Sequence, residues 1–482
     1  MDNTGYTPEE PIAAVATALA PAALGIIRVS GKNSIQLLSK IFSRPKALNE
    51  AAGNTIVYGW IVDSDARIDE VLVSVFRAPK SFTGEEMAEI SCHGGTAVVT
   101  QIFNLLLQNG FRQAERGEFT FRAFINGKAD LTKAEAVREI IESRTNTSSQ
   151  KAAGRLAGNL QAQIAAIQKS LIDTLAQIEV EIEYPEDEET IADAYDQTKL
   201  LEAIAQLETL ASTWKSEKLY QEGARLVLCG KTNAGKSSLF NSLLKEERAI
   251  VSDIEGTTRD WIESWISIDG IPARLFDTAG LRSTSDEIEA RGVESAKELS
   301  DEADLLLYLA DVTLPKDQID LAFLAERKEP VIFVWNKLDK LPQDQKAAGQ
   351  EALQDQKAAA ICEAQKFFEA ASKKIPALSG QVFVSAKNGG GVKDLVAMAK
   401  ALLLKGQETE RSQAGLGSER QKRLVESALE SLRHAASLQK GYSLDAAVQD
   451  IEDALDFLGE LTGRVTADDI LDSVFSNFCV GK

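Results

Sequence analysis

The sequence has few of the residues that crosslink small domains or bind structural metals. Its four cysteines are Cys92, Cys229, Cys362 and Cys479; they show no CxxC spacing, and no signal peptide precedes them. Disulfides and structural zinc are therefore not expected. No apolar run approaches the length of a membrane span. We expect a soluble, cytoplasmic protein that makes no membrane contact.

Basic residues are fewer than acidic ones. The chain has 53 Lys and Arg against 73 Asp and Glu, a formal net charge of −20. Such a surface repels nucleic acid, so any RNA contact must use a local basic patch or a basic partner. Histidine is limited to His93 and His434, and the SCHGG context of His93 is more typical of a structural residue than of a catalytic one. The length of 482 residues predicts roughly three domains.

A phosphate-binding loop is the clearest motif. Residues 230–237, GKTNAGKS, fit the pattern GxxxxGK[ST] and lie between an expected strand, ARLVLC, and an expected helix, SSLFNSLL. Backbone N–H groups in such a loop, together with the helix N-terminus, surround phosphates. Lys236 would neutralise the β- and γ-phosphates, and the Ser237 hydroxyl would bind Mg²⁺. This motif alone indicates a nucleoside triphosphate.

Three later motifs specify guanine and follow in the order that a GTPase requires. LFDTAG (275–280) places Asp277 to hold Mg²⁺ through water and Gly280 to sense the γ-phosphate. IFVWNKLD (332–339) supplies Asn336, Lys337 and Asp339, and VFVSAK (382–387) supplies Ser385, Ala386 and Lys387. The Asp339 carboxylate can accept hydrogen bonds from guanine N1–H and from the exocyclic amine, a donor pair that adenine lacks.

Two details set this GTPase apart from signalling GTPases. Leu281 occupies the position where those proteins have a glutamine that orients water, so hydrolysis needs another polar group, and the acidic stretch 285–289 lies just downstream. Asn233 lies within the phosphate loop and could hold a monovalent cation together with carbonyls of the switch segment 252–260. The alternative is that Asn233 is a turn residue tolerant of positive φ. The sequence does not show whether Arg259 points toward the phosphates as an arginine finger does.

Outside this core the chain changes character. Residues 25–31, 70–76 and 88–95 are expected strands, interleaved with helices at 34–42 and 97–110. From about residue 121 the pattern is helical, including one amphipathic run over about 148–182. We therefore expect a multidomain α/β plus α protein, in which a Ras-like P-loop GTPase domain is inserted into a discontinuous helical domain. The expected domains are an α+β domain at 1–120, helical parts at 121–218 and 406–482, and the GTPase domain at 219–405.

The chain resembles the MnmE (TrmE) family of tRNA-modifying GTPases over nearly its whole length. The segments that carry the resemblance are GIIRVSG, SFTGEEMAEISCHGG (81–95), RGEFTFRAFINGKADLTKAEAV (116–137), GKTNAGKSSLFNSLL, VSDIEGTTRD, DTAGLR and the terminal FCVGK. One departure is the segment 20–24, Ala-Pro-Ala-Ala-Leu, where the family usually has a glycine-rich run.

The resemblance implies a specific activity. Members hydrolyse GTP and, with the FAD-binding partner MnmG, install an aminomethyl-type (carboxymethylaminomethyl) group on C5 of the wobble uridine of certain tRNAs. They bind a folate, 5-formyltetrahydrofolate or a related tetrahydrofolate, in the N-terminal domain, through which they form homodimers. The GTP-binding residues it implies are Asn233, Ala234, Gly235, Lys236, Ser237, Ser238, Ser252, Asp253, Ile254, Glu255, Gly256, Thr257, Thr258, Asp277, Thr278, Ala279, Gly280, Asn336, Lys337, Asp339, Ser385, Ala386 and Lys387.

The resemblance also assigns ions and a second site. It implies that Ser237 and Thr258 bind Mg²⁺. The K⁺ ligands that it implies are Asn233, Ser252, Ile254 and Thr257. The catalytic residues it implies are Glu289, which holds the attacking water through a second water, with Lys236, Asn233 and Cys479. The folate residues it implies are Arg28, Glu89, Lys128 and Lys482.

Two alternatives stay open at this stage. Cys479 either attacks the uridine as a nucleophile or packs so that the tail presents Lys482, and no histidine base lies near it in sequence. The whole chain could instead be a regulatory switch in ribosome assembly or in a stress response, with hydrolysis as its only chemistry. The folate residues and the CVGK end favour the modification enzyme, and the absence of a basic appendage argues against ribosome assembly.

Overall fold

The computed structural model describes residues 10–183, 197–246, 262–277, 302–341, 350–405, 415–438, 444–464, 468–476 and 478–481. The chain forms two compact units and passes from one to the other four times. Unit 1 contains Met1–Arg138, Arg155–Leu207 and Arg420–Lys482, and unit 2 contains Glu139–Gly154 and Glu208–Glu419. Among the described helices, none combines the length and the apolar character of a membrane span.

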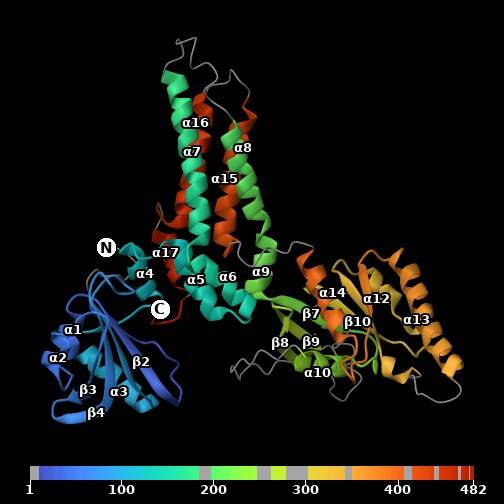
Figure 1. The fold of residues 1–482 in the computed structure, drawn as a ribbon, viewed down its shortest axis with the longest axis horizontal. Coiled ribbons are helices and arrows are strands. Elements are labelled where there is room, and N and C mark those ends of the chain that lie inside the picture. Colours follow the sequence, from blue (N-terminus) through green and yellow to red (C-terminus); the bar gives the residue numbers. More distant parts are fainter. Residues whose placement is uncertain are drawn as a thin grey trace, which may run out of the picture. The chain divides into compact units, whose positions relative to one another are not determined.

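Unit 1 begins with a mixed sheet of six strands in the order β3-β4-β5-β2-β1-β6 (Figure 1). Their bounds are β1 Ile12–Val15, β2 Ala22–Ser30, β3 Thr55–Asp63, β4 Ala66–Phe76, β5 Met87–Gly94 and β6 Arg112–Gln113. The three strands predicted from the sequence are β2, β4 and β5, at the centre of the sheet. The antiparallel register of β2 and β5 places Arg28 opposite Glu89.

The two faces of this sheet differ. Alternate residues of β4, such as Val71 and Val73, are buried against the helices α1 (Ser34–Ser39) and α3 (Thr96–Gln108). The intervening Leu72 is 47% exposed. Alternation of this kind is typical of a sheet that buries one face. The other face therefore presents apolar side chains, namely Leu24, Ile56, Tyr58 and Leu72.

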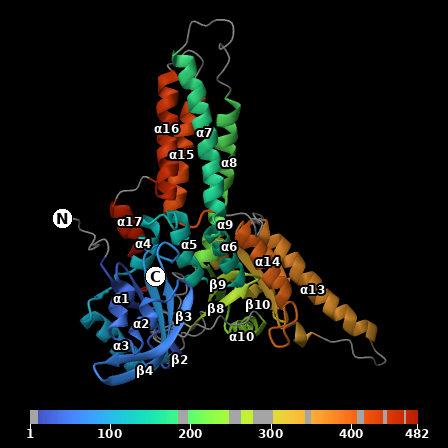
Figure 2. The ribbon, with the colours of Figure 1, turned by 60° about the vertical axis from the view of Figure 1, so that its left-hand side comes forward.

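Long helices complete unit 1. In Figures 1 and 2, α7 (Asn159–Glu183), α8 (Thr198–Ser212), α15 (Glu419–Ser437) and α16 (Leu444–Thr462) run side by side. The shorter helices are α2 Pro45–Asn49, α4 Glu118–Ile125, α5 Leu131–Glu142 and α17 Asp468–Phe475.

The single run expected at 148–182 is two helices, α6 (Asn146–Leu156) and α7. Gly158 separates them with a φ of +93°, a backbone conformation that ends a helix and that glycine adopts without strain.

The last residues of the chain return to the N-terminal sheet. Phe475 and Phe478 are buried with Leu131 and Ala134. Val480 forms an antiparallel bridge with Arg116. A Cβ on Gly481, whose φ is +94°, would lie 3.0 Å from the carbonyl oxygen of Val15. The tail therefore lies against the N-terminal part of unit 1.

Unit 2 contains a six-stranded sheet in the order β12-β11-β10-β7-β9-β8, in which only β8 is antiparallel to its neighbour. Its strands are β7 Ala224–Cys229, β8 Ile262–Ile268, β9 Ile271–Asp277, β10 Leu305–Asp311, β11 Val331–Asn336 and β12 Leu378–Phe383. β10 and β11 are buried along their whole length, as expected of strands covered on both faces. The helices are α9 Trp214–Glu222, α10 Lys236–Glu246, α12 Leu321–Ala325, α13 Gln350–Ser372 and α14 Val392–Leu404. The expected fold class is confirmed.

A short segment from earlier in the chain packs into unit 2. Thr145 Oγ1 donates to the carbonyl of Gly270 at 2.7 Å. Lys151 and Glu217 form a buried ion pair at 2.6 Å. Because both charged groups are desolvated, loss of one partner would remove a buried ion pair and destabilise this unit. The residues 139–154 are thus an integral part of this unit.

Candidate functional site

The phosphate loop connects β7 to α10, as the motif predicts. Gly230 has a φ of +129°, and a Cβ there would collide with the carbonyl of Leu309. Gly235 has a φ of +99°, and a Cβ there would collide with the side-chain amide of Asn336. Both positions accept glycine alone without distortion, which explains the two glycines of the motif.

Lys236 and Ser237 lie at the start of α10. The buried Lys236 ammonium donates to the carbonyls of Gly230 at 2.6 Å and Lys231 at 3.1 Å, so it lies over the loop that would hold the phosphates. Ser237 Oγ donates to Asp277 Oδ2 at 3.0 Å, and Asp277 is 1% exposed. A hydroxyl and a carboxylate together are the oxygen ligands that Mg²⁺ prefers, so this pair fits a magnesium ion.

Asn336 connects the phosphate loop to the base-recognition loop. Its Nδ2 donates to the carbonyl of Ala234 at 2.9 Å. Its Oδ1 accepts from the backbone N–H of Ala386 at 3.1 Å and of Lys337 at 2.7 Å. The side chain is 2% exposed. A buried amide with three hydrogen bonds of this kind fixes the geometry of the loops it joins.

Asp339 and Ser385, which come from different base-recognition motifs, are in contact. Ser385 Oγ donates to Asp339 Oδ1 at 2.7 Å. One carboxylate oxygen is thereby oriented while Asp339 itself stays half-buried. This arrangement can present the carboxylate to a guanine edge. Lys387, the last residue of the motif, is exposed.

One carboxylate near the base-recognition loop was not predicted from the sequence. Asp311 ends β10, and its Oδ2 lies 2.8 Å from Lys337 Nζ. Burial alone would raise the pKa of Asp311, but hydrogen bonds from Lys337 and Thr313 outweigh it and hold the pKa below its ordinary value. The signal available in the sequence was an acidic residue that ends a wholly apolar strand, LLLYLAD.

Part of the predicted site lies outside the described residues. These positions are Ser252, Asp253, Ile254, Glu255, Gly256, Thr257, Thr258, Thr278, Ala279, Gly280, Glu289 and Lys482. Of the four potassium ligands implied by the resemblance, only Asn233 lies within the residues that the structure describes. It is exposed and has a φ of +64°.

A second polar site lies in unit 1 around Arg28. Arg28 Nε lies 3.0 Å from Glu89 Oε1, and its NH1 donates to the carbonyl of Gly481 at 3.1 Å. The guanidinium lies 5.1 and 5.2 Å from the ring centroids of Phe82 and Phe119. Burial is the main influence and lowers the pKa of Arg28, although Glu89 opposes it. The structure thus brings Arg28, Glu89 and the C-terminal tail together.

Lys128 contacts the loop that carries Phe82. Its exposed Nζ donates to the carbonyl of Pro79 at 3.0 Å, and the neighbouring Asn126 donates to the carbonyl of Thr83 at 2.7 Å. Cys479 is exposed, and it lies two residues before Gly481 in the sequence. His93 pairs with the buried Asp69 at 2.7 Å.

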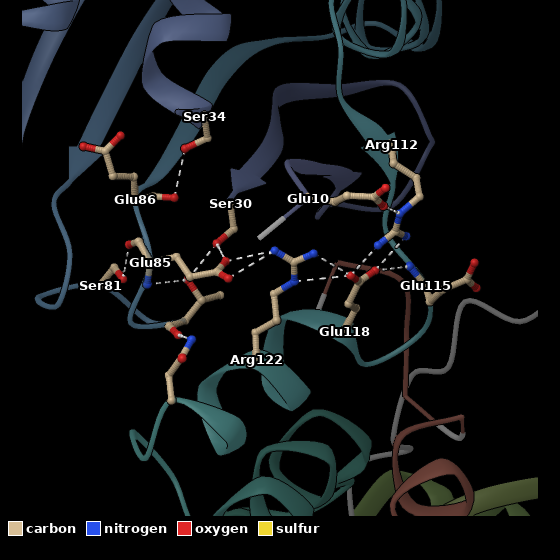
Figure 3. A network of polar contacts seen from close by, with 12 residues as sticks. Glu10, Ser30, Ser34, Ser81, Glu85, Glu86, Arg112, Glu115, Glu118 and Arg122 are labelled. Atoms are coloured by element: carbon tan, nitrogen blue, oxygen red, sulfur yellow. Dashed lines mark hydrogen bonds and ion pairs between the residues drawn. The ribbon is translucent and has the colours of Figure 1, made fainter. Parts of the chain in front are cut away.

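A buried charge network fixes this loop to α4 (Figure 3). Arg122, which is 0% exposed, lies 3.0 Å from Glu85 and 2.8 Å from Glu118. Arg112 contacts Glu118 at 2.7 Å, and Ser30 Oγ donates to Glu85 at 2.8 Å. The sequence analysis did not identify this network, because nothing in the spacing of these residues shows that they meet.

The fold and the nucleotide site define the class of this protein: it is a P-loop GTPase. The family model described as "MnmE helical domain" matches residues 131–479, and the model "GTP-binding protein TrmE N-terminus" matches residues 11–128. The chain belongs to the MnmE (TrmE) family of tRNA modification GTPases.

Relatives match along the full length. The tRNA modification GTPase MnmE of Treponema denticola is 51% identical and covers 99% of both chains. That of Treponema pallidum (strain Nichols) is 42% identical with the same coverage, and that of Borreliella burgdorferi (strain ZS7) is 39% identical over 98% of both. Among solved structures, Aquifex aeolicus Era bound to GDP.AlF4- matches 45% of this chain and 68% of that one, at 25% identity and a TM-score of 0.27.

Proposed function

We propose that this GTPase acts with an FAD-binding partner, MnmG, to add an aminomethyl-type (carboxymethylaminomethyl) group to C5 of the wobble uridine of certain tRNAs. The observation that carries the proposal is the second polar site, where the C-terminal tail accepts a hydrogen bond from Arg28, which in turn pairs with Glu89. A protein whose only chemistry is GTP hydrolysis does not need a second site of this kind in addition to its nucleotide site.

The nucleotide site supports binding of GTP with Mg²⁺. Lys236 would release the loop carbonyls and pair with phosphate oxygens, while Asp339 would accept the guanine donors. Ser237 and Asp277 would orient Mg²⁺, with Thr258 as the further ligand implied by the family. A bound Mg²⁺ supplies positive charge against the β- and γ-phosphates.

The potassium assignment is part of the proposal. Asn233 offers an amide oxygen at the rim of the phosphate loop, and its positive φ suits an asparagine. The family assigns the other ligands to Ser252, Ile254 and Thr257, and the water-holding role to Glu289. A bound K⁺ would supply the charge that an arginine finger supplies elsewhere.

The second site fits a tetrahydrofolate. Glu89 can accept from the ring N–H and amino groups of a pterin, and Arg28 is held by Phe82 and Phe119 in an orientation that serves a carbonyl or carboxylate oxygen. Lys128 and Lys482 are the further ligands implied by the family. Cys479 is a candidate nucleophile for attack on the uridine.

We also propose a homodimer that forms through the N-terminal domain, and a cytoplasmic location. The open sheet face supports the dimer, since Leu24, Ile56, Tyr58 and Leu72 are each between 47% and 65% exposed, on β2 and on the adjacent strands β3 and β4. Contiguous exposed apolar residues of this kind mark interaction surfaces. The predicted domain limits at 120/121, 218/219 and 405/406 belong to the same proposal.

The test is deletion of the gene, followed by mass spectrometry of nucleosides from bulk tRNA. We expect C5-substituted wobble uridines to vanish and to return on complementation with the intact gene. Complementation with Cys479→Ser then tests the thiol. Persistence of the modified uridines after deletion would contradict the proposal and favour the regulatory switch.

A separate measurement tests the potassium assignment. We expect GTP hydrolysis to be faster in K⁺ than in Na⁺, because the dehydrated K⁺ fits oxygen ligands in the loop, and we expect Asn233→Ala to remove that preference. The rates are compared at equal ionic strength with a saturating GTP concentration. Full activity of Asn233→Ala in K⁺ would show that this asparagine is only a turn residue.

A further inference from the structure

A hollow with basic and amide side chains in its lining lies in unit 1 along the first three turns of α7. It has a volume of about 180 Å³ and is lined by Lys133 of α5, by Gly158, Gln161 and Gln168 of the α7 segment, and by Arg464 after α16. The remaining lining residues include alanines, whose small side chains leave the space open. A volume of this size holds several water molecules, and hence a phosphate group.

The charge of the hollow is unlike that of the chain as a whole. Among the described residues that line it, two are cationic and none is acidic. Lys133 Nζ lies 3.5 Å from Asp130 Oδ2, a distance at which the ammonium keeps further N–H donors for another partner. Arg464 is exposed. In a chain of net charge −20, this pair is a local basic site of the kind that the sequence analysis required for RNA contact.

Gln168 provides an independent observation. It is 6% exposed and lines the hollow, yet its side chain makes no hydrogen bond to the described part of the chain. The amide can therefore donate a hydrogen bond to a ligand with oxygen atoms that enters the hollow. Gln161 adds a second amide, whose Oε1 lies 3.6 Å from the position of a Cβ on Gly158.

The start of α7 adds to the same preference. Its first N–H groups, which follow Gly158, have no partner within the helix and carry the positive end of the helix dipole. Ala162 donates to the carbonyl of Gly158 at 2.9 Å, which marks the first closed turn. Oxyanions bind favourably at such an end.

We propose that this hollow binds a backbone phosphate of tRNA. The proposal rests on the proposed function in tRNA modification, because that function supplies the polyanion. Lys133 and Arg464 neutralise the phosphate, and the Gln168 amide donates a hydrogen bond to it. The small residues at 158, 162 and 165 let the phosphate approach the helix.

The test compares four proteins in a binding titration with a fluorescein-labelled tRNA transcript. They are the wild type, the double variant Lys133→Gln with Arg464→Gln, Ala165→Glu, and the control Lys169→Gln. Lys169 is exposed on α7 and does not line the hollow. Ala165 is an exposed helical position, so Ala165→Glu places a carboxylate in the hollow without burying it.

We expect the double variant to bind tRNA about tenfold more weakly and to lower the slope of log affinity against log salt by roughly 1. Ala165→Glu should lose affinity at least as much, and Lys169→Gln should match the wild type. Circular dichroism and GTP hydrolysis without tRNA should be the same in all four proteins. Equal tRNA affinities would overturn the proposal.

A second measurement separates this site from the proposed function. With the nucleotide site saturated by GDP, inorganic phosphate should raise the Tm of the wild type and of Lys169→Gln but not that of Ala165→Glu. If the wild type fails to bind tRNA while this difference persists, the tRNA assignment is overturned and the phosphate hollow stands. If phosphate shifts the Tm of all three proteins equally, the site itself is overturned.

Discussion

Single residues decide what this protein can bind. Asp339 is the residue that we propose distinguishes guanine, and its carboxylate accepts a hydrogen bond from Ser385 at 2.7 Å. We predict that Asp339→Asn weakens GTP binding by at least about 100-fold, because an amide N–H would face the guanine donors. The same change should improve binding of xanthosine triphosphate, whose C2 carbonyl accepts from that amide. Competition titrations with both nucleotides check this. Parallel losses for both would show that the loop has been distorted.

Thiol reactivity offers a second prediction at this scale. Burial raises the pKa of Cys92 to about 11 and that of Cys229 to about 12, so both stay protonated and shielded at neutral pH. Cys362 and Cys479 are exposed. We predict that two thiols of the native protein react rapidly with an aromatic disulfide reagent at pH 8, that Cys479→Ser leaves one, and that all four react after unfolding.

At the scale of elements, the charge network around α4 stabilises the N-terminal part of unit 1. Burial raises the pKa of Glu118, but hydrogen bonds from Arg112, from the backbone of Glu115 and from Arg122 outweigh it, so the pKa lies below the ordinary 4.5. A depressed carboxyl pKa contributes stability above pH 4.5 that is lost as the pH falls through the folded pKa.

We predict that Glu118→Gln lowers the free energy of unfolding by about 3 kcal/mol at pH 7, because two arginines lose a buried partner. The difference from the wild type should shrink as the pH falls below 4.5. Denaturant titrations across pH measure it. The control Glu426→Gln removes an exposed helical pair with Lys422 and should cost at most about 0.5 kcal/mol. A pH-independent difference would mean that Glu118 acts only by packing.

Elements also show how far the sequence could predict the fold. The strands of residues 25–31, 70–76 and 88–95 were predictable because their apolar residues are consecutive or alternate with polar ones, whereas β6, with two residues, is too short to show such a pattern. The break at Gly158 was missed because the apolar periodicity continues on both sides of it. Asn336 was predicted as a guanine residue, but its hydrogen bonds to Ala234 and Ala386 depend on loops that only the fold brings together.

At the scale of the whole molecule, the open face of the first sheet leads to a prediction about assembly. Leu72 is 47% exposed at the centre of that face, so a charge there would be desolvated on dimer formation. We predict that Leu72→Glu converts a dimer into a monomer in analytical ultracentrifugation. Leu314→Glu, at a site 46% exposed in unit 2, is the matched control and should stay dimeric. A wild type that is monomeric at all concentrations would contradict the dimer.

The route of the chain between the two units has a consequence for its synthesis. All of unit 2 has been made once residue 419 has been added, whereas unit 1 still lacks Arg420–Lys482. Because domains fold as units during translation, the GTPase part can reach its native state on the ribosome before α15 and α16, the helices that pack beside α7, have been synthesised. Ribosome-bound chains stalled about 40 residues beyond 419, enough for residue 419 to leave the exit tunnel, should therefore already bind GTP. A premature stop after residue 419 should yield a fragment that binds the nucleotide but has an incomplete, aggregation-prone helical region.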